Sequence, residues 1–266
     1  MIGTLFHVGP FRVHSYGVML VIAFILGTWW TVRRAPGKGI DADRVFSLAG
    51  WILVSSVAGA RLHFVLGHPE SFASPLDLFR IWEGGLTLYG GLLAAIAVSY
   101  LYLRKHRVAF LPIADLMAPA LALGEAVTRL GCFLNGCCFG SPHSGTLAIR
   151  YPPTSYAAQS LGDVHVHPAQ LYLSVGMLLL FLLLWRLDGR GPRTGSLIGG
   201  YLVGQGLVRY LVDFVRHYDP VDRLPALEPL IGAKSQLVAL LLAVVGILIL
   251  LVRPRAGRKE AAGRAA

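Results

Sequence analysis

The chain contains 266 residues, of which 55% are hydrophobic and only 14% are charged. Soluble domains average about 25% charged residues, so the composition excludes an ordinary cytosolic enzyme and a disordered chain. Three cysteines are too few for a disulfide-stapled secreted module. We therefore predict an all-α integral membrane protein.

Seven long apolar stretches follow one another along the chain. A helix that crosses the hydrocarbon core needs about 20 such residues, and lipid requires each segment to pair its own backbone groups. The stretches lack the alternation of barrel strands, so we predict about seven transmembrane helices in a single polytopic domain over 1–266. The stretches cover residues 16–32, 46–66, 86–103, 111–130, 169–186, 195–214 and 235–252.

The basic residues outside these stretches predict the orientation. Fifteen of them lie in the loops 33–44, 104–107 and 186–193 and in a tail at about 253–266, whereas the opposite side carries six. Cytoplasmic loops are rich in lysine and arginine, so we predict a cytoplasmic tail and an N-terminus outside. The net charge of +10 then reflects topology and attraction to anionic membrane lipids. No motif accompanies it that would indicate nucleic-acid binding.

The segments predicted to lie outside are the longer ones. The segment at about 131–168 contains several prolines and glycines and cannot form one helix. Together with the loop 67–85, it is expected to form a small extracytoplasmic cap. The first residues lack a basic region and a cleavage site, so we expect a short external segment before a retained first helix.

Three arginines, Arg61, Arg129 and Arg209, fall near the outer ends of apolar stretches. A charge at the bilayer centre costs about 2.5–3.5 kcal/mol on insertion scales, so each needs a partner, a wet cavity or an anionic ligand. The alternative is that they extend to the outer interface. Arg209 and Asp213 are four residues apart and could pair on one helix face. That pair either locks two helices together or holds an arginine ready for a phosphate, whose geometry matches a guanidinium.

The segment GEAVTRLGCFLNGCCFGSP carries the densest set of reactive side chains. It places Arg129, Asn135, three cysteines and four glycines where the fourth stretch ends. Glycines let a ligand approach backbone amides, and Asn135 could orient a hydroxyl group. The alternative interpretation is a glycine-rich helix end with buried cysteines.

A second glycine-rich run, EGGLTLYGGLLAA, begins the third stretch. Its paired glycines suit close helix packing in lipid. Tyr89 between them, and Tyr16 near the start of the chain, are each either interfacial aromatics or phenols of a site.

Six segments in order resemble the bacterial prolipoprotein diacylglyceryl transferase family: VHSYG, GARLHFVL, EGGLTLYGG, DLMAPALALGEAVTRLGCFLNGCCFG, HPAQLY and VRYLVDFVR. The resemblance implies transfer of the diacylglyceryl group of phosphatidylglycerol to the lipobox cysteine thiol in the signal peptide of a preprolipoprotein, with release of glycerol 1-phosphate. It implies no cofactor, no metal and a multi-pass location in the bacterial inner (cytoplasmic) membrane.

The resemblance also implies roles for individual residues. Arg129 matches the family arginine that binds phosphatidylglycerol, and Arg209 matches a second essential arginine. Asp213 stands where the family has glutamate. Catalytic roles are thus expected for Arg129, Arg209, Asp213, Tyr89 and Tyr16, and substrate-binding roles for Arg129, Gly140, Asn135 and Arg61.

The chain departs from the family pattern at three positions. Cys132 replaces an asparagine, Cys137 replaces a glutamate, and Tyr89 replaces a histidine. A phenol with a pKa near 10 is a poorer base at neutral pH than an imidazole with a pKa near 6.5. The residues expected to hold the phosphate are therefore kept, whereas those expected to activate the acceptor thiol are changed.

Two alternatives follow from these departures. The chain could be a family paralogue that transfers another lipid, with a cysteine as covalent intermediate. It could also be a membrane thiol or metal-site protein built on Cys132, Cys137 and Cys138, as a disulfide or as ligands of a soft metal. Three histidines could join such a metal site: His143, His165 and His167.

Overall fold

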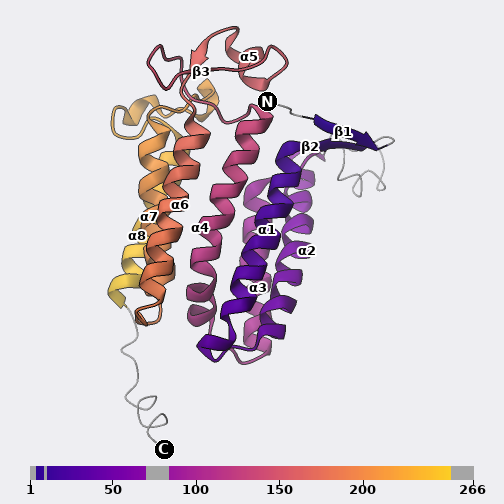
Figure 1. Cartoon of the computed structure of the whole chain (residues 1–266), viewed down its shortest axis with the longest axis vertical. Helices are drawn as coiled ribbons and strands as arrows, with labels where there is room; N and C mark the ends of the chain where they lie inside the picture. Colours follow the sequence, from indigo (N-terminus) through magenta and orange to yellow (C-terminus); the bar gives the residue numbers. More distant parts are fainter. Residues whose placement is uncertain (1–3, 9–10, 70–83, 253–266) are drawn as a thin grey trace, which may run out of the picture. The chain divides into compact units, whose positions relative to one another are not determined.

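The computed structural model describes residues 4–8, 11–69 and 84–252. The basic tail at about 253–266 and most of the loop 67–85 lie outside these residues. Each predicted apolar stretch lies in a long helix of closely similar bounds (Figure 1). A run of apolar residues in lipid must satisfy its backbone hydrogen bonds internally, and a helix does so. The long helices are α1 (Ser15–Arg34), α2 (Ala42–Gly67), α3 (Leu88–Lys105), α4 (Phe110–Asn135), α6 (Ala169–Asp188), α7 (Ser196–Asp213) and α8 (Lys234–Val252).

The protein is an all-α integral membrane protein. In the described part of the chain, five helices are long and apolar enough to cross a membrane, namely α1, α2, α4, α6 and α8. The other two long helices, α3 and α7, have 18 residues each. The count of seven transmembrane helices therefore stays a prediction.

Short elements connect the long helices. Two antiparallel strands, β1 (Thr4–Val8) and β2 (Phe11–His14), precede α1. A second antiparallel pair, β3 (Ile149–Arg150) and β4 (His165–Val166), flanks the short helix α5 (Tyr156–Leu161). Single 3-10 turns are η1 (Pro36–Lys38), η5 (Pro220–Asp222) and η6 (Pro225–Leu227).

The chain divides into two compact units. Unit 1 contains residues 1–27 and 114–266, and unit 2 contains residues 28–113. In unit 2, α2 packs along α3. A side chain at Gly90 would collide with the carbonyl oxygen of Gly59, so the glycine pair of the third stretch serves close helix packing, as its spacing predicted.

In unit 1, α7 packs against both α6 and α8. The first turn of α7 is capped from α4, because the carboxylate of Asp115 accepts hydrogen bonds from the amides of Leu197 (3.0 Å) and Ile198 (2.8 Å). A carboxylate suits this place because the first amides of a helix have no partner within the helix. This contact fixes α4 relative to α7.

Residues 136–168 form a cap that lies over one end of α4 and α6 (Figure 1). Residues 131–135, which were predicted to belong to the cap, instead continue α4. The cap has a small core of its own made by Phe139, Tyr151, Ala157 and Val166. It contains strands and a short helix rather than one helix, as the prolines and glycines predicted. It is also the part of the chain that holds the end of α4 in place.

Candidate functional site

The C-terminal end of α4 turns back on itself at Gly136. The amide of Gly136 donates to the carbonyl of Phe133 (3.2 Å), and the amide of Cys137 donates to the carbonyl of Cys132 (3.1 Å). This pair of bonds is the Schellman motif, which requires a left-handed residue after the helix. Gly136 supplies it with φ +72°, and the turn places Cys137 over Cys132.

The three cysteines form one cluster. Their sulfur atoms all lie within 4.8 Å of one another, and all three thiols are free. Cys132 is buried, whereas Cys137 and Cys138 are half-buried. Among the described residues, no histidine joins this group; His143 instead stacks on His167 in the cap, with ring centroids 3.8 Å apart.

The loop after α4 is held from α6 and from the cap. Gln170 donates from Nε2 to the carbonyl of Cys137 (2.7 Å), and Tyr151 donates from its hydroxyl to Oε1 of Gln170 (3.1 Å). Asn135, a predicted binding residue, has its side chain beside the Cys137 thiol. The cysteine segment is therefore a supported structure and not a free loop.

Gly140 joins this loop to the chain after α7. Its amide donates to the carbonyl of His167 (2.9 Å), and Ser141 next to it donates from its amide to the carbonyl of Val215 (2.8 Å). A side chain at Gly140 would lie 2.6 Å from the His167 oxygen and 2.7 Å from the Val215 oxygen. Glycine is required because two backbones approach it, and the pairing brings Cys138 near Arg216.

Arg129 and Glu125 lie one helical turn apart on α4. Nη2 of Arg129 is 3.2 Å from Oε1 of Glu125, and both side chains are less than one-fifth exposed. Residues four apart share one face of a helix, so this pairing follows from the spacing. Glu125 offsets part of the cost of placing Arg129 near lipid.

Asp213 is the centre of a second set of polar contacts. Its carboxylate is fully buried, and Nε of Arg209 lies 3.1 Å from its Oδ1, which confirms the predicted pairing. Ser235 at the start of α8 donates to Oδ2 at 2.6 Å. Arg216 lies 3.9 Å away, and its guanidinium covers the ring of Tyr218 at 5.0 Å.

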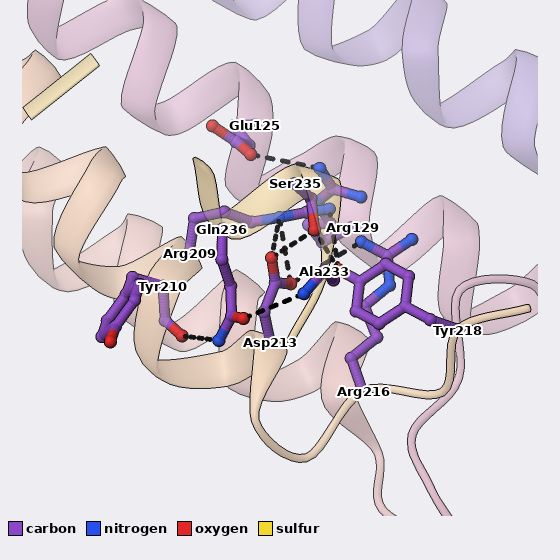
Figure 2. A network of polar contacts seen from close by, with 10 residues as sticks. All are labelled: Glu125, Arg129, Arg209, Tyr210, Asp213, Arg216, Tyr218, Ala233, Ser235 and Gln236. Carbon is purple, nitrogen blue, oxygen red and sulfur yellow. Dashed lines mark hydrogen bonds and ion pairs between the residues drawn. The ribbon is translucent and has the colours of Figure 1, made fainter. Parts of the chain in front are cut away.

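Tyr218 and Gln236 complete the network that Figure 2 shows. The hydroxyl of Tyr218 is 2.6 Å from Oγ of Ser235 and accepts from Nη2 of Arg209 (3.4 Å). Burial raises the pKa of Tyr218 above its ordinary value, so this phenol stays protonated. Gln236 accepts from the amides of Gly232 (2.7 Å) and Ala233 (3.2 Å) and donates to the carbonyl of Tyr210 (3.4 Å), which ties α8 to α7.

Some guanidinium N–H groups of the site arginines make no hydrogen bond within the described part of the protein. Nε of Arg129 and both Nε and Nη1 of Arg216 are buried, and among the described residues they have no hydrogen-bond acceptor. Buried donors are nearly always satisfied in folded proteins, and guanidinium donors suit phosphate oxygens. The arrangement can therefore bind an anion.

Sequence reasoning missed Arg216, which it counted only as a loop charge, together with Tyr218, Ser235 and Gln236. The spacing of three residues from Asp213 could have indicated Arg216. Tyr218, Ser235 and Gln236 reach the site only because the segment 214–236 folds back. No local sequence pattern predicts that fold.

Tyr16 lies at the start of α1 against the end of α4. A side chain at Gly131 would lie 3.3 Å from the Cα of Tyr16, so glycine allows the two helices to approach. Tyr16 is also within electrostatic reach of Arg129 and the three cysteines. The structure therefore brings Tyr16 together with the predicted site of unit 1.

Two predicted site residues, Arg61 and Tyr89, belong to unit 2. Nη1 of Arg61 donates to the carbonyls of Gly84 (2.8 Å) and Gly85 (3.3 Å), and its guanidinium lies 5.9 Å from the ring centre of Phe64. Tyr89 is 55% exposed at the start of α3. Arg61 therefore orders the chain that leads into α3.

The pKa of the Cys138 thiol is shifted by its neighbours in the cluster. Hydrogen bonding with the thiols of Cys132 and Cys137, followed by the positive charges of Arg216 and Arg129, lowers the pKa of the Cys138 thiol below its ordinary value. A lowered thiol pKa marks a reactive cysteine or a metal ligand, because both need the thiolate.

Comparison with known proteins agrees with the resemblance seen in the motifs. The family model described as prolipoprotein diacylglyceryl transferase matches residues 3–252. Three relatives carry the name phosphatidylglycerol–prolipoprotein diacylglyceryl transferase. The protein from Chromohalobacter salexigens is 33% identical over 90% of this chain and 87% of its own. That from Bordetella parapertussis is 34% identical over 93% and 94%, and that from Klebsiella pneumoniae is 35% identical over 81% of each. The chain therefore belongs to the prolipoprotein diacylglyceryl transferase family.

Proposed function

We propose that this membrane protein transfers the diacylglyceryl group of phosphatidylglycerol to the lipobox cysteine of a prolipoprotein signal peptide and releases glycerol 1-phosphate. The names of the relatives support the two substrates, and the motifs support the reaction. We place the protein in the bacterial inner membrane as a multi-pass protein, with its N-terminus outside and its C-terminus in the cytoplasm.

The observation that carries the proposal is the set of buried guanidinium donors without an acceptor. Arg129 and Arg216 present three such nitrogen atoms among the described residues. A buried donor without a partner costs about 1–3 kcal/mol. A phosphodiester in this place would supply both the acceptors and the negative charge, and phosphatidylglycerol carries such a group.

The same donors suit the chemistry. The thiolate of the acceptor attacks the glycerol carbon that bears the phosphate, so a C–S bond forms and a C–O bond breaks. The phosphate leaves with the electron pair and approaches the charge of a monoester, about −1.5 to −2. Arginines that already face the phosphate stabilise this growing charge more in the transition state than in the ground state.

Within this proposal, Asp213 orients Arg209 toward the phosphate, and Arg129 and Arg216 bind its oxygens. Asn135 and Gly140 position the end of α4 and the loop that carries the cysteines. Tyr16 shapes the lipid site beside Arg129. By resemblance to the family, we assign a substrate-binding role to Arg61 and a leaving-group role to Tyr89.

Complementation tests the proposal. The wild-type chain is expressed in a strain depleted of its own transferase, and we expect restored growth and lipidated prolipoprotein. Arg129→Ala should fail at equal membrane expression. Arg150→Ala is the matched control, because Arg150 pairs with Asp163 on the exposed surface of the cap and should complement fully. A wild-type chain that reaches the membrane without restoring lipidation would contradict the proposal.

A further inference from the structure

The cysteine cluster has the dimensions of a metal site. The three cysteines are the only ones in the sequence, and their sulfur atoms lie within 4.8 Å of one another. Zinc binds thiolates at about 2.3 Å in a tetrahedron, which places the sulfur atoms about 3.8 Å apart. The thiols therefore already lie close to the spacing that a zinc site requires.

The backbone around the thiols is already fixed. The Schellman motif at Gly136 holds Cys137 over Cys132, and Gln170 holds the carbonyl of Cys137. Cys138 adopts φ +60°, a conformation that costs a non-glycine residue about 1–2 kcal/mol. Such strain persists where the surroundings impose it, and it is frequent at functional sites.

The number of protein ligands distinguishes structural from catalytic zinc sites. Structural zinc sites have four protein ligands, whereas catalytic sites have three and leave the fourth position to water or substrate. Among the described residues, the cluster contains three cysteines, and no histidine, aspartate or glutamate joins them. The cluster therefore matches the catalytic class.

The charges nearby are positive. Arg129 precedes Cys132 by three residues and shares its helix face, and the pairing of residues 139–141 with 215–217 brings Arg216 beside Cys138. A zinc ion with three thiolates carries one negative charge in total. Arginines stabilise that anionic group, and they bring it close to the phosphate that they are proposed to bind.

The cluster lies in a place where a metal ion could act on the acceptor thiol. Among the described residues, no histidine, aspartate or glutamate joins the three cysteines. An acceptor thiol bound beside them would therefore find no side-chain base in the cluster. A thiol that coordinates zinc is deprotonated outright, so the metal would replace the missing base.

We propose that Cys132, Cys137 and Cys138 bind Zn²⁺ as thiolates, and that the fourth position takes the lipobox thiol of the acceptor. The inference rests on the proposed transferase function. On coordination the acceptor thiol releases its proton to water. The zinc-bound sulfur then attacks the glycerol carbon, the C–O bond to phosphate breaks, and the phosphate leaves with the electron pair. No oxidant or reductant is needed.

Metal analysis of the purified full-length protein is the first test. We expect about one zinc per chain and zinc-edge X-ray absorption that shows sulfur ligands at about 2.3 Å. Each Cys→Ser variant should lose the metal, while Ser141→Ala, on the adjacent loop, should keep it. A chelator should remove zinc from the folded wild-type protein, and added Zn²⁺ should restore it. This result does not depend on whether the variants fold. Protein that binds no zinc after reduction and reconstitution, or that contains a native disulfide among these cysteines, would overturn the inference.

The fourth position is tested with cobalt in place of zinc. A lipobox peptide with its cysteine should shift the visible spectrum of the Co²⁺ protein, and the same peptide with serine should not. Equal spectra with both peptides would overturn the role of the acceptor as ligand.

Activity separates this inference from the proposed function. Removal of zinc should lower diacylglyceryl transfer by about 100-fold or more, the usual contribution of proton removal from a nucleophile. Full activity in zinc-free enzyme would refute the zinc site and leave the transferase function intact. Zinc-loaded enzyme without any transfer would instead refute the transferase function.

Discussion

Asp213 organises the arginines because its carboxylate is fully buried and bonded on several sides. Arg209 and Ser235 contact it directly, and Arg216 lies at 3.9 Å. A buried carboxylate is stable only when its charge is paired, and the two arginines supply that pairing. Within the proposed function, we therefore expect Asp213 to fix the direction of Arg209 rather than to react.

The variant Asp213→Asn tests this role. The amide keeps the shape and removes the charge that pairs with Arg209, and a hydrogen bond to a charged group is worth about 1.5–3 kcal/mol. We expect kcat/KM for diacylglyceryl transfer to fall by roughly 10- to 150-fold. Asp163→Asn, which breaks an exposed pair in the cap, should change the rate little. Equal rates for Asp213→Asn and the wild type would show that the pair only joins helices.

The thiol of Cys138 should be reactive at unusually low pH. Its pKa is lowered, first by hydrogen bonding with Cys132 and then with Cys137, and also by Arg216 and Arg129. A lowered pKa keeps the thiolate present as the pH falls, whereas an ordinary thiol near pKa 8.5 becomes protonated and unreactive. In reduced, metal-free protein, iodoacetamide at pH 6 should label Cys138 ahead of Cys137, as measured by peptide mass spectrometry. Arg216→Ala should raise the pH at which Cys138 reacts.

At this scale the sequence predicted pairs but not the whole network. The spacing of Arg209 and Asp213 indicated a contact on one helix face, and the structure confirms it. Arg216, Tyr218 and Ser235 reach the same place only because the chain between α7 and α8 folds back. Such contacts depend on tertiary structure, and no periodicity reveals them.

At the scale of elements, the end of α4 controls the site, because the turn at Gly136 sets the position of the cysteines. Gly136 and Gly39 have nearly the same φ, +72° and +69°. A side chain at Gly136 would lie 2.9 Å from Cβ of Ser155, whereas one at Gly39 meets nothing within 4 Å. The two glycines therefore separate backbone strain from packing.

We expect Gly39→Ala to cost about 1–2 kcal/mol through strain alone and to leave the cysteine cluster unchanged. Gly136→Ala should cost more, because Ser155 must also move, and it should lower zinc binding and transfer together. Thermal unfolding in detergent measures the first effect, and metal analysis measures the second. Equal loss of stability in both variants would show that Ser155 does not restrain the turn.

The long helices were predictable, whereas the internal structure of the cap was not. Each apolar stretch is long because lipid demands it, so helix positions follow from composition. The proline- and glycine-rich segment 131–168 indicated only that no single helix forms there. Its strands and α5 depend on a small core around Tyr151 and Val166, which local sequence does not specify.

At the scale of the whole molecule, the number of spans and the orientation remain predictions. Five described helices are long and apolar enough to cross a membrane, whereas α3 and α7, with 18 residues each, are long enough but less apolar. If all seven long helices cross, the loops 35–41, 106–109 and 189–195 share the cytoplasmic side, where the basic residues gather.

Reporter fusions test this topology. Green fluorescent protein fused after residues 105 and 190 should fluoresce, and alkaline phosphatase fused within 143–147 should be active. Inverse results at residue 105 would mean that α3 does not cross the membrane. A fusion after residue 252 provides the control for the predicted cytoplasmic tail.

Purified protein in bilayers of phosphatidylglycerol, incubated with a lipobox peptide, tests the proposed transfer in a single reaction. We expect a peptide whose mass increases by one diacylglyceryl group on its cysteine, and glycerol 1-phosphate released in equal amount. Arg129→Ala should form neither product. A wild-type protein that binds both substrates yet yields no thioether, or that releases no glycerol phosphate, would contradict the proposed transfer.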